Sequence, residues 1–350
     1  MLEVITYLLR CMIVMKISIQ SCPPTDSYLR WASQIGVDCL DAVSLPGIEQ
    51  VGSAGGQGCA DLDKLLKLKR WIRSFGIDMN RVSLPNIGKF MLGQAGGDEQ
   101  VENACKTLKI LGEARIPIAR PTFATRSGVW PEAHGAPKEW PKAKPMRRVH
   151  RGGYVMRGFD LTAMRKHMAE TGADRTEVLP EEWWPRVEEY YGRIVSIAEE
   201  CGVKIAMHPS DAPMPDTPFS GLGYHHILDL RPSPKNGLLY CVGTRHEEGG
   251  TQLVLDEINY FGRKGKIFLV HFRNVRGSLA TTGAFEEVLL DDGDMNMFEI
   301  LLALQKVGYD GCLNPDHMPI LEGDSPDQRA AWSYSVGYIK ALQATLAALP

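Results

Sequence analysis

Short apolar segments alternate with amphipathic helical segments along most of the chain, and this alternation limits the possible folds more than any other feature. The apolar segments are bounded by glycine or polar turn residues, as buried strands are, while the segments between them have apolar residues at helical spacing. Regular alternation implies parallel strands joined by crossover helices. The predicted strands are residues 16–20, 37–43, 77–84, 116–120, 203–208, 238–241, 266–275 and 312–316.

Two stretches fall outside this pattern. Residues 1–14 are apolar but interrupted by two charges, too short to span a membrane and without a cleavage site, and Met15 directly precedes the first strand. We interpret 1–14 as a leader or a mis-assigned start, and 15–350 as one domain. Residues 121–180 form an excursion rich in Pro, Gly, Trp and Arg. A loop this long usually has a function, so we predict a lid; a solvated basic face is the alternative.

Charge and cysteine usage limit the partners and the compartment. A formal net charge of −3 gives no reason to expect nucleic acid or an anionic membrane as a partner. The cysteines are scattered, and several fall within apolar patterns, as reduced buried thiols do. We therefore expect a cytoplasmic location. We also expect a small-molecule ligand and a homo-oligomer.

Four consecutive predicted strands end in a side chain that can bind a transition metal: His208, Cys241, His271 and Asp316. Imidazole, thiolate and carboxylate groups together favour Zn²⁺ or Fe²⁺ and do not exclude Mn²⁺. Four unrelated polar residues at loop starts are the alternative interpretation. In parallel α/β proteins the carboxyl ends of the strands form the ligand-binding face.

These strand ends also bear on the architecture. Eight strand–helix units close into a (β/α)8 TIM barrel, and 350 residues suit one barrel with insertions. An open, doubly wound sheet is the alternative. Side chains at the ends of four successive strands converge across a barrel mouth but spread apart along an open sheet. We therefore predict the barrel.

Two further residues suggest chemistry beside the metal. His317 follows Asp316 directly, and an imidazole suits acid–base catalysis near pH 7. Arg273 is two residues from His271 and so shares its face of the strand, where a guanidinium would suit a carboxylate or phosphate. A structural role is the alternative for Arg273. A metal, a histidine and an anion-binding arginine fit proton removal α to a carboxylate, with loss of a β-hydroxyl.

Five motifs resemble those of the mannonate dehydratases over roughly residues 203–317. They are His208-Pro209-Ser210-Asp211-Ala212-Pro213, Ser233-Pro234-Lys235-Asn236-Gly237 with Cys241, Val270-His271-Phe272-Arg273-Asn274-Val275, Asp292-Gly293-Asp294-Met295-Asn296-Met297 and Pro315-Asp316-His317. The resemblance implies a xylose-isomerase-like TIM barrel. It also implies a hydro-lyase that uses Mn²⁺ and converts D-mannonate to 2-keto-3-deoxy-D-gluconate in hexuronate catabolism.

The resemblance assigns roles residue by residue. The metal ligands would be His208, Cys241, His271 and Asp316, with His317 as the catalytic acid–base and Tyr334 as a second catalytic residue. The chain departs from the family pattern in three places. It lacks the Arg-Trp-Tyr-Gly segment after the first strand, it has Pro-Ser-Asp-Ala-Pro after His208, and Met318 replaces a glycine.

These departures leave more than one activity open. The principal hypothesis is a metal-dependent lyase acting on a sugar acid, most simply D-mannonate. The alternatives are a dehydratase of a different aldonate and a sugar isomerase or epimerase on the same barrel. Those isomerases bind metal mainly through carboxylates, whereas this chain offers one, at Asp316. A non-catalytic sugar-binding protein with a structural metal is a further alternative, but it would give His317 no function.

Overall fold

The computed structural model describes residues 15–20, 24–42, 58–122, 147–163, 166, 170, 180–209 and 221–349. The predicted leader at 1–14 lies outside these residues, as does much of the predicted lid-like excursion at 121–180. Within the described residues, no helix has the length and apolar character needed to cross a membrane.

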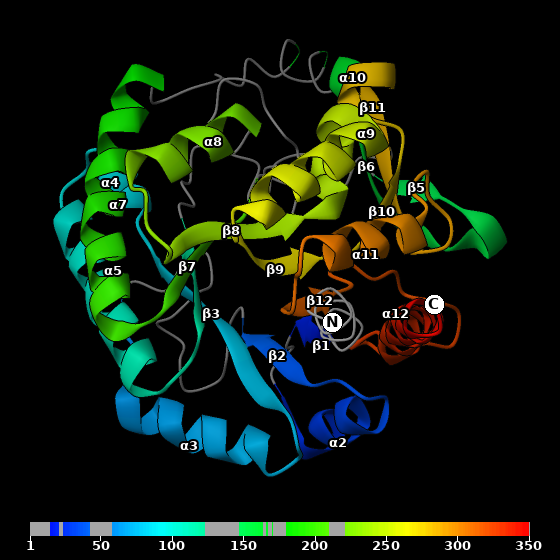
Figure 1. Cartoon of the computed structure of the whole chain (residues 1–350), viewed down its shortest axis with the longest axis horizontal. Helices are drawn as coiled ribbons and strands as arrows, with labels where there is room; N and C mark the ends of the chain where they lie inside the picture. The colour runs from blue at the N-terminus through cyan, green and yellow to red at the C-terminus, as the bar shows by residue number, and fades with distance from the viewer. Residues whose placement is uncertain are drawn as a thin grey trace, which may run out of the picture.

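Eight parallel strands form a closed barrel (Figure 1). Following hydrogen-bonded neighbours, the order is β1, β12, β9, β8, β7, β4, β3 and β2, so β1 joins the first part of the chain to the last. The TIM barrel prediction is confirmed, and all eight predicted strands are present. Their bounds are Lys16–Gln20 (β1), Cys39–Ala42 (β2), Asp78–Asn86 (β3), Ile118–Thr122 (β4), Lys204–Met207 (β7), Asn236–Cys241 (β8), Ile267–His271 (β9) and Cys312–Asn314 (β12).

Helices surround the barrel, because each buries an apolar stripe against the strands. In α3, for example, Leu65 and Ile72 are fully buried, together with Lys69, whose ammonium donates to the carbonyl oxygens of Ala114 and Arg115. The helices are α2 (Asp26–Gln34), α3 (Leu62–Arg73), α4 (Gly88–Met91), α5 (Gly97–Glu113), α7 (Pro180–Cys201), α8 (Gly221–Leu230), α9 (Val242–Arg263), α10 (Leu279–Thr282), α11 (Met297–Lys306) and α12 (Arg329–Ala347), with a 3-10 turn, η2, at Arg151–Gly153.

One end of the barrel interior is apolar. Buried residues from six strands meet in a single cluster, which is possible only inside the barrel, and several of them lie at the amino ends of their strands. The cluster comprises Cys39, Ile118, Ala206, Leu239, Phe268, Leu269 and Cys312. Polar side chains are thus left to the carboxyl end, where barrel enzymes bind their ligands.

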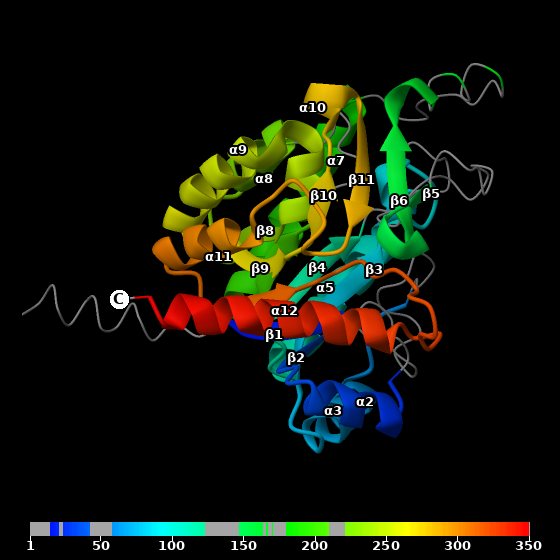
Figure 2. The ribbon, with the colours of Figure 1, turned by 90° about the vertical axis from the view of Figure 1, so that its right-hand side faces the viewer.

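A small antiparallel sheet stands beside this carboxyl end, and the sequence did not predict it. Its order is β10 (Asn274–Arg276), β11 (Ala284–Val288), β6 (Val155–Asp160) and β5 (Arg147–Val149). Figure 2 shows β6 and β11 side by side, outside the barrel strands. The described part of the 121–180 excursion therefore contributes two strands to this sheet. That the excursion acts as a lid stays a prediction.

The predicted strand 266–275 is wrong in its second half. β9 ends at His271, and residues 274–276 pair with β11 instead. Asn274 stabilises the change of direction: its amide donates to the carbonyl oxygens of Leu290 and Met295, at 2.8 and 3.0 Å. Apolar character continues through both segments, so the sequence pattern alone shows no break.

The sequence pattern predicts a helix from Gln252 to Phe261 after β8, but the observed helix begins earlier. α9 starts directly after Cys241 and bends at Gly250, whose φ of 80° and ψ of −175° favour glycine. The adjacent Gly249 and Gly250 disguise the first half of the helix in the sequence, because glycine has low helix propensity. The early start has a chemical consequence, since it places a helix amino terminus at Cys241.

Candidate metal centre

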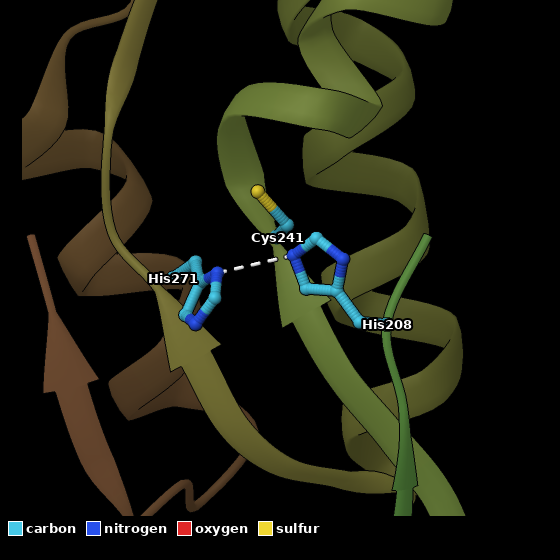
Figure 3. A group of neighbouring side chains, drawn as sticks. All are labelled: His208, Cys241 and His271. Atoms are coloured by element: carbon cyan, nitrogen blue, oxygen red, sulfur yellow. Dashed lines mark hydrogen bonds between the residues drawn. The ribbon is translucent and has the colours of Figure 1, made fainter. Parts of the chain in front are cut away.

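Three of the four predicted ligands lie together on adjacent strands (Figure 3). His208 follows β7, Cys241 ends β8 and His271 ends β9, with Cys241 and His271 directly paired across the two strands. All three are buried, and their ligand atoms lie within 4.8 Å of one another. The Nε2 atom of His208 is 3.1 Å from the Nδ1 atom of His271.

Asp316, the fourth predicted ligand, lies two residues after β12 and next to His271. Its Oδ2 atom lies 3.3 Å from His271 Nδ1, and its Oδ1 atom accepts a hydrogen bond from the side chain of Gln20 on β1. The backbone of Asp316 is left-handed, with a φ of 68°, a conformation that costs a non-glycine residue about 1 kcal/mol or more. The Asn314 side chain holds it by accepting from the Asp316 backbone N–H at 2.8 Å. Such strain is common where a side chain must be aimed at a ligand.

His208, Cys241 and His271 can hold one divalent cation, and Asp316 lies next to His271 as the proposed fourth ligand. Two atoms bound to one ion at roughly 2.1–2.2 Å stand about 3.0–3.5 Å apart for bond angles of about 90–109°. The His208–His271 distance of 3.1 Å and the His271–Asp316 distance of 3.3 Å both fall in this range. Two imidazole nitrogens that face each other also need a proton or a cation between them. The donor set is that of a transition-metal site.

The protonation states suit metal binding as well. Burial lowers the pKa of His208 well below its ordinary value, and it also lowers the pKa of His271. Burial alone would raise the pKa of Asp316, but His271 and His317 hold that pKa well below its usual range. At neutral pH the imidazoles are therefore neutral and the carboxylate is ionised, which are the forms that bind metals.

Cys241 is the N-cap of α9, so the positive end of the helix dipole faces its sulfur. The Sγ atom accepts hydrogen bonds from the backbone N–H of Thr244 at 3.4 Å and from the Thr244 hydroxyl at 3.1 Å. These donors stabilise negative charge on the sulfur, and the thiolate is the form of cysteine that binds metals.

Arg273 lies beside the ligands, but internal acceptors occupy its donors. Its Nε atom is 3.2 Å from Asp316 Oδ2, its Nη1 atom is 2.6 Å from Glu247 Oε1, and its Nη2 atom donates to the Thr244 hydroxyl at 2.9 Å. Strand alternation correctly placed Arg273 toward His271, since both contact Asp316. That it binds a substrate carboxylate stays a prediction, and its contacts support the structural alternative.

His317 pairs with a carboxylate that the sequence analysis did not identify. Its Nδ1 atom is 2.9 Å from Oε1 of Glu287 on β11, and its Nε2 atom is 3.5 Å from Asp316 Oδ2. Burial would raise the pKa of Glu287, but Arg157, His317 and Arg273 hold it far below its usual range. An ionised carboxylate only accepts hydrogen bonds, so Nδ1 carries a proton and donates it to Glu287.

Tyr334 does not join this group. It lies on α12, 41% exposed, and its hydroxyl accepts a hydrogen bond from Arg151 at 3.4 Å rather than from a ligand or from His317. A cavity of about 710 Å³ is lined by both residues together with Tyr154 and Leu289, among others. The catalytic role that the resemblance implies for Tyr334 stays a prediction.

The sequence analysis missed Glu247, Thr244 and Glu287, which surround the ligands. Glu247 and Thr244 lie in the half of α9 that was not predicted, and Glu287 lies on a strand of the unpredicted sheet. A weak signal existed for Glu287, because it lies next to apolar residues in Ala284–Val288.

The sequence is similar to that of one known protein family. The family model described as D-mannonate dehydratase (UxuA) matches residues 139–348, more than half of the chain. The mannonate dehydratase of Thermotoga maritima is 25% identical over 340 residues, covering 87% of this chain and 92% of its own. That of Geobacillus thermodenitrificans is 26% identical, covering 81% and 85%.

A solved structure has the same fold. The mannonate dehydratase of Streptococcus suis serotype 2 superposes with a TM-score of 0.75 at 21% identity, covering 95% of this chain and 93% of its own. The resemblance found in the sequence motifs is thereby confirmed. The chain belongs to the D-mannonate dehydratase family.

Proposed function

We propose that this protein is a metal-dependent hydro-lyase that converts D-mannonate to 2-keto-3-deoxy-D-gluconate in cytoplasmic hexuronate catabolism. The observation that carries the proposal is the buried group of His208, Cys241, His271 and Asp316 with the His317–Glu287 pair next to it. Family membership supports the same reaction. We propose Mn²⁺ as the cofactor, with Fe²⁺ or Zn²⁺ as alternatives that the same ligands can bind.

The reaction needs a proton removed next to a carboxylate and a hydroxyl protonated as it leaves. A divalent cation held by the four ligands would stabilise the negative charge that develops beside the carboxylate. His317 would move the proton at Nε2, the ring nitrogen that is not bonded to Glu287, while the Nδ1–Glu287 hydrogen bond holds the ring in place. Arg273 and Thr244 would keep Asp316 and Cys241 in position.

An isomerase or epimerase reaction has less support. Asp316 is the sole carboxylate among the four proposed ligands, whereas sugar isomerases on this barrel use mainly carboxylates. The family match is also to dehydratases. The choice among aldonates is a separate question, which the substrate experiment answers.

Incubation with a panel of aldonates tests the proposal directly. We expect the Mn²⁺-loaded protein to release a 2-keto-3-deoxy acid from D-mannonate faster than from D-gluconate or D-galactonate, as measured by chromatography and mass spectrometry. The matched control is the chelated protein, which should be inactive until Mn²⁺ is returned. Isomerised sugars without loss of water would contradict the proposal.

Arg273→Lys tests what Arg273 does. Lysine keeps the charge but loses the planar fork that reaches Asp316, Glu247 and Thr244 together. We expect metal affinity to fall about 10–100-fold, the usual cost of losing a residue that positions a ligand. Metal titration of the purified variant measures this. Unchanged metal affinity with much weaker turnover would instead support contact with the substrate carboxylate.

A further inference from the structure

A second buried arginine, Arg81 on β3, points into the barrel. Val82 and Leu84 pack outward in the main core, so Arg81 and Ser83 face the interior, and the Arg81 Nη1 atom is 3.3 Å from the Ser83 hydroxyl. A β-bulge lies at this point, because Leu40 pairs with Met79 while Asp41 pairs with Arg81. The bulge turns the chain so that Arg81 comes opposite Asp41.

Two of the three donor nitrogens of Arg81 lack acceptors among the described residues. The side chain is fully buried, and neither Nε nor Nη2 has a hydrogen-bond partner among the described residues. Asp41 does not supply one, since its carboxylate accepts from Ser18, Asn80 and Asn314 at 2.6–2.9 Å. A buried guanidinium without an acceptor is costly, because it has lost its hydration and gained nothing in return.

Arg81 lies near the metal centre. Asp41, its pairing partner on β2, accepts a hydrogen bond from Asn314, whose side chain in turn accepts from the Asp316 backbone N–H. Burial lowers the pKa of Arg81, while Asp41 and Asp316 are close enough to raise it. Burial is the main cause that lowers the pKa of His271, Asp316 raises it, and Arg81 adds a smaller lowering effect. Its guanidinium is therefore within electrostatic range of two of the proposed ligands.

The two buried arginines, Arg273 and Arg81, differ in whether their guanidinium nitrogens have hydrogen-bond acceptors. All three nitrogens of Arg273 contact internal acceptors. In Arg81, the two nitrogens without partners are Nε and Nη2, which present parallel N–H groups along one edge of the guanidinium. That edge matches the two oxygens of a carboxylate.

We infer that Arg81 binds the carboxylate of the sugar acid, as a residue that sets specificity for an anionic substrate. The inference rests on the proposed function for the substrate, and on the geometry of Arg81 for the residue. This inference places the residue that binds the anion on β3. Strand alternation in the sequence had instead suggested Arg273, which follows β9 on the opposite side of the barrel.

The test compares the Mn²⁺-loaded full chain with Arg81→Met and Arg81→Lys. The ligands are D-mannonate, D-gluconate and D-mannonamide, the neutral amide; KM is measured where there is turnover and Kd, by calorimetry, where there is none. We expect Arg81→Met to weaken binding of the carboxylates about 10²-fold, with kcat reduced less, and to leave the amide unaffected. Arg81→Lys should recover part of the loss.

Thermal unfolding separates this role from a structural one. Arg81→Met removes a buried cation that has no acceptor, so Tm should stay the same or rise. The matched control, Arg273→Met, leaves Glu247 and Asp316 buried without their cation and should lower Tm. A similar fall in Tm for Arg81→Met, with carboxylate binding unchanged, would overturn the inference.

The outcomes also distinguish this inference from the proposed function. If D-mannonate is dehydrated but Arg81→Met binds it normally, the function stands and the inference is wrong. If the unmodified protein dehydrates no aldonate, the proposed function fails, and the titrations still decide the role of Arg81. Carboxylate binding lost selectively in Arg81→Met would support it, and absence of carboxylate binding by the unmodified protein would contradict it.

Discussion

Replacement of His317 by asparagine is expected to lower turnover about 10²–10⁴-fold, the usual range for losing a general acid–base group. Metal content should not change, because His317 is not one of the four proposed ligands and its ring pairs with Glu287. Asparagine keeps a polar group of similar reach without a titrating nitrogen. Steady-state kinetics and metal analysis on the same preparation measure both effects.

Glu287→Gln is the matched variant for His317. Glutamine keeps the size of the side chain but can accept or donate, so it no longer requires the proton on Nδ1. We expect kcat to fall while KM and metal content hold, and Glu287→Asp to restore part of kcat. Loss of metal in His317→Asn would show that His317 is itself a ligand, and unchanged turnover would remove it from the mechanism.

Replacement of Cys241 by serine is expected to abolish stable metal binding, and turnover with it. The hydroxyl of serine stays protonated at neutral pH, so the substitution replaces a thiolate by a weak neutral donor. Because removing a residue that only positions a ligand weakens metal affinity 10–100-fold, losing a ligand should cost more than about 10²-fold. Metal titration, with thermal unfolding in the presence and absence of Mn²⁺, measures the change.

Cys39→Ser is the control for the chemistry of a buried thiol, since Cys39 lies in the apolar cluster at the other end of the barrel interior. It should lower stability without changing metal affinity. Full metal occupancy in Cys241→Ser, with normal affinity, would contradict the assignment of Cys241 as a ligand and would leave His208, His271 and Asp316 as the candidate set.

Much of the fold followed from local patterns in the sequence. Strand periodicity and turn residues located all eight barrel strands, and the rule that ligands bind at the carboxyl ends of parallel strands brought His208, Cys241 and His271 together. Errors arose where local patterns were ambiguous. The apolar run from His271 to Val275 continues across the point where the chain passes from the barrel to the small sheet. Gly249 and Gly250 lower the helix propensity of the first half of α9, so the sequence pattern did not indicate a helix there.

By itself, the sequence determined which side chains stand at the strand ends, because the direction of a side chain on a strand depends on its immediate neighbours. Only the tertiary structure decided which partner each side chain meets. Arg273 and Arg81 look alike in the sequence, yet Arg273 contacts Glu247, Thr244 and Asp316. Among the described residues, Arg81 has only the Ser83 hydroxyl as an acceptor, and its Nε and Nη2 atoms have none. Those partners come from distant parts of the chain, and their positions depend on closure of the barrel and on a sheet built from residues more than a hundred positions apart.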